Sequence, residues 1–493
     1  MRSPSALAGV RFAGPLMAAR FVRRLNRFAA LVELAGEPAR AGSCRGSVGP
    51  GTWIVARPPK ANSYPLRFEW SLLLAGTDEE GQMFAVGATC TACGTEYGLG
   101  RIYRCESCNS PLDIRYDYGK ISRGAFDPAG GSRAEGMWTH RELLPVAPEY
   151  IVSLGEGRTP LLRCPRLGER LGFASLWVKD ETRQPTGSFK DRPLSVAVSK
   201  AKELGAKTVV TASSGNAAAA MSAYAARAGL RAVVLVAADT PPGKLLQMCA
   251  AGARVVRVTG SVSNSIGMAK AATKTFNWYN VTTTFENPYS VEGDKTVAYE
   301  IAAELGWRAP DWIVVPTGSG PLPAGIWKGF GEMQQFGLVA ALPKMVVAQA
   351  AGCAPIADAF RSGGDIVTPW PAPQTIASGI NDPLVGYSED GTYTLKIVRK
   401  SGGAAVAVSD EEILRVTRLM VGTEGLYAEP TAGTAAACAV ELLRRGTIGP
   451  DDEVVVVSTG HGLKQPFVGT EELEALPEIA PSLTALAALS LDN

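Results

Sequence analysis

The sequence predicts an α/β protein in which helices wrap parallel sheets, preceded by a small cysteine-rich module. Three observations support this fold class. From about Tyr150 onward, short β-branched runs alternate with alanine-rich helical segments. Loops rich in glycine and hydroxyl residues follow three of these runs, and two C-x-x-C pairs lie upstream of them. Two parallel-sheet subdomains facing a cleft fit a chain of 493 residues.

The composition limits the classes of function. With 49 basic and 47 acidic residues the formal net charge is +2, so nothing in the charge indicates a nucleic acid or an anionic membrane as partner. A hydrophobic content of 46% and 54 glycines are typical of a large α/β enzyme. No apolar run reaches the roughly 18 residues that a membrane span needs. We therefore expect a soluble, cytoplasmic body.

Residues 1–82 differ from the rest of the chain. Six arginines precede the first acidic residue, Glu33, and residues 42–59 show no hydrophobic periodicity. An Arg-rich start without acids is typical of an organellar transit peptide. The interpretation that we favour is an upstream extension, with Met83 as the natural beginning. Under either interpretation we expect low order in residues 1–82.

Four of the nine cysteines form one cluster of two C-x-x-C pairs, joined by a short strand-like segment. This spacing is typical of a tetrahedral zinc ribbon, and Gly94 suits its tight turn. Because four thiolates leave no position for water, the Zn²⁺ would be structural. Redox pairs are the alternative, although such motifs normally come singly. We predict a zinc ribbon over residues 83–118 with the ligands Cys90, Cys93, Cys105 and Cys108.

The predicted body spans residues 150–475 and is followed by a tail at 476–493. Strands are expected at 208–211, 233–236, 255–258, 312–315, 345–348 and 454–457. Helices are expected at 217–227, 244–251, 265–275 and 296–305. Ligands of such sheets bind at the carboxyl ends of the strands, so the loops after these runs are the candidate site.

The segment Pro185–Arg192, with the sequence PTGSFKDR, places Lys190 at an expected helix start. The positive end of a helix disfavours an ammonium group and so lowers the pKa of an amine there. A neutral amine is what Schiff-base chemistry requires, because only that form attacks a carbonyl. A solvated surface lysine is the alternative, and for a lysine considered by itself it is the common case.

Three loops follow predicted strands. In the first, Ser213–Asn216, the Asn216 amide can donate to a phenolate oxygen. The second, Gly318–Leu322, has backbone N–H groups and a following helix that suit a phosphate, although a plain tight turn fits its glycines equally well. The third carries Thr459 and His461, and we assign no acid–base role to this histidine.

Taken together, these segments resemble the threonine synthases among the tryptophan-synthase-β-like, fold type II pyridoxal-phosphate (PLP) enzymes. The resemblance runs in order from about Cys90 to Pro466 and rests on GEGRTPL (155–161), PTGSFKDR, SSGN, EGDKT (292–296) and STGHGLK (458–464). It implies a two-domain fold, PLP as cofactor, a homodimer and, in many members, a Cys₄ ribbon. The cofactor-binding residues that it implies are Phe189, the Schiff-base residue Lys190, Asn216 at the 3′-oxygen, Gly318, Ser319, Gly320, Pro321 and Leu322 at the phosphate, and Thr459 at the pyridine nitrogen.

A hydroxyl opposite the pyridine nitrogen has a chemical consequence. It leaves that nitrogen largely unprotonated, whereas a carboxylate would hold a proton there. The ring is then a weaker electron sink, which favours elimination and replacement at Cβ or Cγ over transamination.

The chain also departs from the family pattern. Ala217 lies where a threonine is expected, Ser290 where an arginine is expected, and GSGPL replaces G-N-A-G-N in the phosphate loop. In the family several of these positions help to hold the substrate's phosphate. Loss of two charge-assisted hydrogen bonds, each worth roughly 1.5–3 kcal/mol, would weaken binding by about a hundredfold or more.

Three hypotheses follow. The first is a PLP-dependent lyase that converts the small-molecule substrate O-phosphohomoserine, with water, to threonine and phosphate. The second keeps the cofactor but acts by β-elimination or β-replacement on another amino acid, as a serine/threonine ammonia-lyase or an enzyme of O-activated serine. The third is a catalytically inactive member that binds a partner through the ribbon, and the intact Lys190, Asn216 and Thr459 argue against it.

Overall fold

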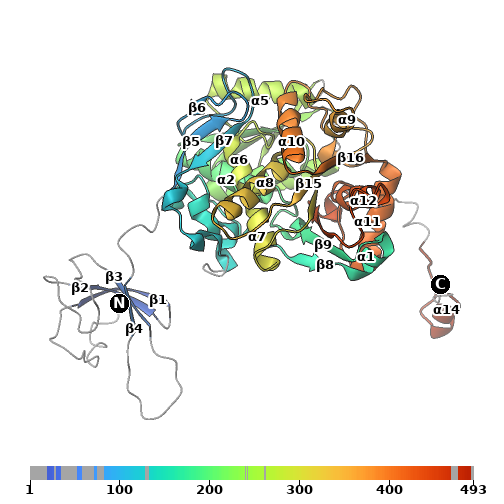
Figure 1. The fold of residues 1–493 in the computed structure, drawn as a ribbon, viewed down its shortest axis with the longest axis horizontal. Helices are drawn as coiled ribbons and strands as arrows, with labels where there is room; N and C mark the ends of the chain where they lie inside the picture. The colour runs from blue at the N-terminus through green and yellow to red at the C-terminus, as the bar shows by residue number, and fades with distance from the viewer. Residues whose placement is uncertain are drawn as a thin grey trace, which may run out of the picture. The chain divides into compact units, whose positions relative to one another are not determined.

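The computed structural model describes residues 19–26, 29–34, 53–57, 71–74, 83–127, 133–238, 240, 242–259, 262–467 and 476–489 (Figure 1). The chain divides into two compact units, Met1–Gln82 and Met83–Asn493. The first unit contains an antiparallel sheet in the order β1 (Ala19–Asn26), β2 (Ala29–Leu34), β3 (Trp53–Arg57), β4 (Ser71–Leu74). Most of residues 1–82 lie outside the described residues, so low order there stays a prediction.

The second unit begins with the cysteine-containing segment 83–118, called the ribbon below. Its three antiparallel strands lie in the order β6 (Glu96–Tyr97), β5 (Ala85–Cys90), β7 (Leu112–Tyr116). Buried and partly exposed residues alternate along β7, as expected for a strand with one face on a core. Short 3₁₀ segments continue the chain at Tyr118–Lys120, Arg123–Phe126, Arg133–Leu143 and Pro148–Tyr150.

The larger sheet of the body has six strands. Their order is β16 (Ala404–Val408), β15 (Lys344–Ala350), β14 (Trp312–Pro316), β17 (Glu453–Ser458), β9 (Ser175–Asp180), β8 (Leu161–Arg163). All neighbours are parallel except β8 and β9. The accompanying helices are α1 (Pro165–Leu171), α7 (Thr296–Glu304), α8 (Pro321–Gln335), α9 (Pro355–Arg361), α10 (Ser388–Lys400), α11 (Asp410–Glu424) and α12 (Pro430–Arg444).

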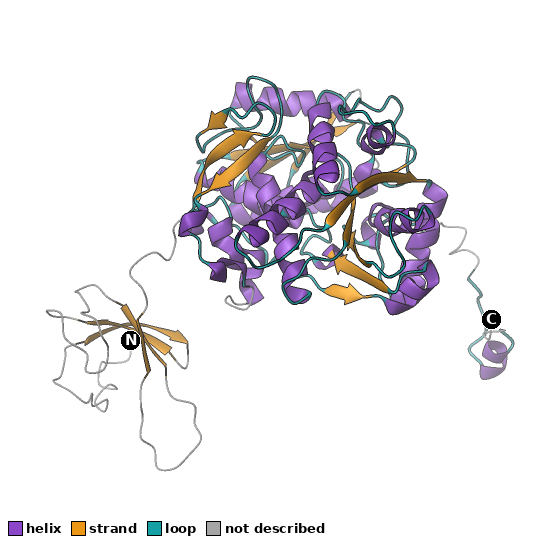
Figure 2. Cartoon of the chain, in the orientation of Figure 1, coloured by secondary structure: helices purple, strands orange, loops and turns teal. Residues whose placement is uncertain are grey.

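Helices cover both faces of this sheet (Figure 2), and its strands β14 and β16 are apolar along their whole length. Ile313 and Val315 pack in a cluster with side chains of α7, α8 and the ribbon. Trp312 and Val314 point to the other face, where they pack with α1, α11 and α12. Successive side chains of a strand point to opposite faces, which explains why the run WIVVP is buried throughout.

The smaller sheet has four parallel strands in the order β12 (Arg254–Val258), β11 (Arg231–Ala237), β10 (Thr208–Ala212), β13 (Tyr279–Asn280). Its helices are α2 (Asp191–Glu203), α3 (Asn216–Ala228), α4 (Pro242–Ala250) and α5 (Val262–Phe276), and α6 (Pro288–Asp294) follows it. Short segments at Glu181–Arg183, Ser378–Ile380 and Gly462–Lys464 are 3₁₀, and α14 spans Leu483–Ala487. Within the described part of the chain, no helix is both long and apolar enough to cross a bilayer.

The predicted α/β class with parallel sheets is confirmed. Each of the six predicted strands overlaps an observed strand, and the four predicted helices correspond to α3, α4, α5 and α7. The predicted boundaries of ribbon, body and tail stay predictions, because residues 83–489 form part of one compact unit.

A buried ion cluster holds the amino end of α2. The guanidinium of Arg192 lies 2.8 Å from Glu181 Oε2 and 2.7 Å from Glu300 Oε2, and Lys179 Nζ lies 2.9 Å from the same Glu300 oxygen. All four side chains are buried. Burial by itself raises the pKa of Glu300, but Arg192 and Lys179 hold that pKa well below its ordinary value. The cluster therefore joins β9 and the turn after it to α2 and α7.

We predict that Arg192→Met lowers the free energy of unfolding by about 3–5 kcal/mol, because it leaves the carboxylates of Glu181 and Glu300 buried without their main counter-charge. Chemical denaturation measures this loss. Arg361→Met is the matched control, since Arg361 pairs with Asp358 at the exposed surface, where such a pair contributes about 1 kcal/mol or less. Equal losses in the two variants would contradict the interpretation.

Candidate active site

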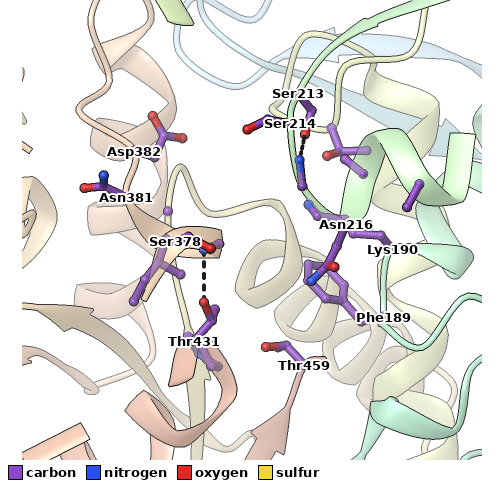
Figure 3. A pocket seen from close by; sticks show the side chains of 18 of the residues that line it. Phe189, Lys190, Ser213, Ser214, Asn216, Ser378, Asn381, Asp382, Thr431 and Thr459 are labelled. Atoms are coloured by element: carbon purple, nitrogen blue, oxygen red, sulfur yellow. Dashed lines mark hydrogen bonds between the residues drawn. The ribbon is translucent and has the colours of Figure 1, made fainter. Parts of the chain in front are cut away.

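A cavity of about 640 Å³ opens where the carboxyl ends of β10, β14 and β17 meet. Loops after these strands line it, together with the segments 282–284 and 378–383 and the residues Glu429 and Thr431. In Figure 3, Asn381 and Asp382 lie on one side of the cavity, and Lys190 and Asn216 lie on the other. This is the position at which open α/β sheets bind ligands.

Lys190 lies at the N-cap position of α2, and its side chain reaches the cavity. The turn before it is fixed to the end of β17, because Phe189 N donates to Thr459 O at 2.9 Å and Ser188 pairs with Gly460. Within the described residues Nζ has no hydrogen-bond partner; it lies 4.5 Å from the centre of the Phe189 ring. Burial lowers the pKa of Lys190, with Asp294 and Asp382 acting in the opposite direction. The physical cause is therefore mainly burial, whereas the sequence pattern indicated the helix end.

Asn216 begins α3 and points to an acidic partner that sequence reasoning missed. Its Nδ2 donates at 2.9 Å to Oε1 of Glu429, which is 4% exposed and lies at the N-cap position of α12. A Cβ at Gly460 would overlap the Glu429 carboxylate and approach Asn216 Nδ2, so only glycine leaves room for this pair. The one local signal for Glu429 was an acid immediately before the proline that starts a helix.

The loop Gly318–Leu322 joins β14 to α8, and all five of its residues line the cavity. Gly320 has φ +116°, and a Cβ there would overlap Thr394 Oγ1 of α10. Thr394 Oγ1 lies 2.9 Å from Ser319 O, so α10 holds this loop from behind. The amino end of the 15-residue helix α8 adds its positive dipole. Such a loop can bind a phosphate group.

Thr459 follows β17, and its hydroxyl is buried against the cavity (Figure 3). Among the described residues, Thr459 Oγ1 has no hydrogen-bond partner. A buried hydroxyl left in that state costs about 1–3 kcal/mol. The arrangement therefore suits a ligand whose polar atom meets Thr459 when it fills the cavity.

Two further acids, which the sequence pattern did not indicate as site residues, lie near Lys190. Asp382 lines the cavity beside Gly318, accepts a hydrogen bond of 2.6 Å from the Tyr387 hydroxyl, and has its pKa raised by burial. Asp294 ends α6 and is 1% exposed; burial raises its pKa to about 8, although Lys190 lowers it. The EGDKT motif contained Asp294, but only the fold brings it into electrostatic contact with Lys190.

The positively charged groups of the cavity are few. Among the described residues that line it, the basic side chains are those of Lys190, His461 and Lys464, and none is an arginine. Lys464 Nζ donates to Thr186 O at 2.8 Å and to Gln247 Oε1 at 2.7 Å, and burial lowers its pKa.

Two of the positions that depart from the family pattern, Ala217 and Ser290, differ in location. Ala217 lines the cavity. Ser290 does not: it is fully buried in α6, and its hydroxyl donates to Asn287 O at 2.7 Å. Thr282, Thr283 and Thr284, from the segment before α6, form that part of the wall.

The four cysteines of the ribbon converge as the spacing predicted. Their sulfur atoms all lie within 4.8 Å of one another, with Cys90 and Cys108 Sγ 3.4 Å apart and Cys93 and Cys105 Sγ 3.5 Å apart. Backbone N–H groups of Ala92 and Cys93 point at Cys90 Sγ, and the Tyr97 hydroxyl donates to Cys105 Sγ at 3.3 Å. Donors of this kind stabilise thiolates, and the set suits a tetrahedral metal ion.

Comparisons with known proteins agree with this geometry. Residues 152–460 match the family model "Pyridoxal-phosphate dependent enzyme". A threonine synthase of Methanocaldococcus jannaschii is 40% identical over 380 residues, which cover 76% of this chain and 92% of that protein. A threonine synthase of Synechocystis sp. is 38% identical over 331 residues, covering 66% and 82%.

The solved structures bear on the fold alone. The processed form of threonine deaminase isoform 2 from Solanum lycopersicum matches with a TM-score of 0.56 at 21% identity, covering 71% of this chain and 94% of that one. Maize serine racemase matches with a TM-score of 0.55 at 21% identity, covering 64% and 90%. Family model, relatives and fold agree: the chain belongs to the fold type II PLP-dependent enzymes and, within them, to the threonine synthase family of lyases.

Proposed function

We propose that this enzyme converts O-phosphohomoserine and water to threonine and phosphate, with PLP bound to Lys190 as a Schiff base. The observation that carries the proposal is the amine of Lys190, which has no hydrogen-bond partner within the described residues and reaches one cavity together with Asn216, the Gly318–Leu322 loop and Thr459. The choice of reaction is supported by the similar threonine synthases, because the match to this chain covers most of the length of each of them.

The cavity fits the cofactor part by part. The Gly318–Leu322 loop would hold the phosphate, Asn216 the 3′-oxygen, and the buried Thr459 hydroxyl the ring nitrogen. Phe189 packs beside the lysine and lines the same wall. When bound, PLP supplies a conjugated ring that accepts electrons from the Cα of the amino acid.

Lys190 is the residue suited to move protons in this reaction. Burial favours its neutral amine, and a neutral amine can take a proton from Cα and return one at Cβ or Cγ. The pair of Asn216 and Glu429 fixes the direction of the Asn216 amide. The Thr459 hydroxyl carries no charge, so it leaves the ring nitrogen without a counter-ion that would hold a proton there.

The substrate's phosphate needs a cation and hydroxyl donors. Lys464 is the lysine that lines the cavity in addition to Lys190, and the hydroxyls of Ser213, Ser214 and Thr283 line it as well. A second candidate function is β-elimination or β-replacement on another amino acid. The observation that favours it is the absence of an arginine from the described cavity wall, together with Ala217 at a wall position.

Lys190→Ala should abolish the visible absorption band of the bound cofactor, because the other lysine of the described cavity wall, Lys464, has its amine engaged with Thr186 O and Gln247 Oε1. The wild-type enzyme should show the band, and borohydride reduction followed by peptide mass spectrometry should locate the cofactor on Lys190. Lys207→Ala, at an exposed lysine on the surface, is the control and should keep the band. A wild-type protein that takes up no PLP would refute every enzymatic interpretation.

Phosphate release from O-phosphohomoserine should exceed ammonia release from serine and threonine under matched conditions. Lys464→Gln should raise the KM for O-phosphohomoserine about tenfold or more, because a hydrogen bond to a charged group contributes about 1.5–3 kcal/mol. Lys207→Gln should leave this KM unchanged. Negligible phosphate release beside rapid ammonia release would establish the second candidate in place of the first.

Elemental analysis should find about one zinc ion per chain, as a Cys₄ site requires. Cys105→Ser should remove that ion, because it eliminates one of four thiolate ligands. Cys249→Ser is the matched control, since Cys249 is exposed and lies outside the cluster. Full zinc content in the Cys105→Ser variant would show that the cluster is not the metal site.

A further inference from the structure

The second C-x-x-C loop of the ribbon is clamped to the body of the enzyme by one buried arginine. Arg104 immediately precedes Cys105, and its side chain is 6% exposed. Its Nε donates to Asn109 O at 2.8 Å, which closes the loop Cys105–Cys108 from outside. The other end of the guanidinium lies 2.7 Å from Asp390 Oδ1, in the first turn of α10.

Asp390 connects this arginine to the wall of the cavity. Its carboxylate is fully buried, and Oδ2 accepts a hydrogen bond of 3.2 Å from Phe285 N. Phe285 directly follows the segment Thr282–Thr284, which lines the cavity. The rings of Phe285 and Tyr393, 5.3 Å apart, add a second contact between this segment and α10.

One turn further along α10, Thr394 reaches the loop expected to hold the cofactor's phosphate. Its Oγ1 lies 2.9 Å from Ser319 O and 2.9 Å from Asp390 O. The close approach at Gly320, where no Cβ fits, leaves little freedom between α10 and the loop. A displacement of the amino end of α10 would therefore displace the Ser319–Gly320 turn.

We propose that the ribbon is part of the support of the active site: Arg104, held by the metal-binding loop, is a positioning residue that fixes α10 through Asp390 and thereby sets the phosphate loop and the Thr282–Thr284 wall. This inference rests on the proposed function, because it assumes that the Gly318–Leu322 loop binds PLP. Its consequence is that an intact metal site increases the affinity for the cofactor, although the metal lies outside the cavity.

The test measures the dissociation constant of PLP by titrating the visible absorption band in full-length protein. Arg104→Gln and Asp390→Asn should each raise it about fivefold or more, the lower end of typical coupling between sites. The double variant should lose no more affinity for PLP than either single variant, since each substitution removes the same ion pair. Arg104→Lys keeps the charge and should restore part of the affinity.

Arg101→Gln is the matched control. Arg101 also extends from the ribbon to the body, where it donates to Asn277 O at 3.1 Å, but that contact is exposed and does not involve α10. The PLP dissociation constant of the Arg101→Gln variant should stay within about twofold of the wild-type value. Hydrogen exchange should increase in residues 317–322 and 282–285 of Arg104→Gln and stay unchanged in α11 and α12.

A second measurement does not depend on the folding of any variant. Chelation of zinc from the wild-type holoenzyme should raise the PLP dissociation constant by a similar factor, and readdition of zinc should restore it. Unchanged PLP affinity in both Arg104→Gln and the zinc-free wild type would overturn the inference. The proposed function fails on a different result, which is a wild-type protein that binds no PLP at Lys190.

Discussion

The placement of Lys190 depends on the buried guanidinium of Arg192, two residues further along α2. Its N–H groups reach both oxygens of Glu181 and both oxygens of Glu300, as well as the hydroxyls of Thr159 and Thr296. A buried ion pair is a weak source of net stability, because desolvation offsets much of the attraction. The planar fork of donors is instead a strong geometric constraint. It sets the amino end of α2 against β9 and α7, and Lys190 lies at that end.

Glycines at three contact points allow the parts of the site to approach one another. A Cβ at Gly293 would overlap the carbonyl of Arg192, a Cβ at Gly320 would overlap Thr394, and a Cβ at Gly460 would overlap Glu429. The first contact brings α6 onto α2, the second brings α10 onto the phosphate loop, and the third admits the pair of Asn216 and Glu429. These motif glycines are thus required for close packing between elements as well as for the turns in which they lie.

Local patterns predicted much of this fold, and their limits have physical causes. The runs at β10 and β14 are β-branched and fully buried, so their composition alone indicated strands. The partners of Asn216 and Lys190 were not predictable in the same way, because Glu429 and Asp382 lie about 200 positions away and only strand order brings them near. For Ser290 the motif predicted a contact that the fold does not make. The resemblance to the family placed this residue at the substrate, but at the start of α6 its hydroxyl donates to Asn287 O.

The surroundings of Lys190 suit a group that must both accept and release a proton. In water an ammonium with a pKa of 10.5 and a carboxyl with a pKa of 3.8 would both be charged at neutral pH. Burial lowers the pKa of Lys190 and raises that of Asp294 to about 8, so the two pKa values lie closer together than they would in water. Their mutual attraction acts in the opposite direction but is the smaller effect on each. Burial therefore favours the neutral form of both groups, and the packing of α6 against α2 brings Asp294 close enough to Lys190 to affect its pKa.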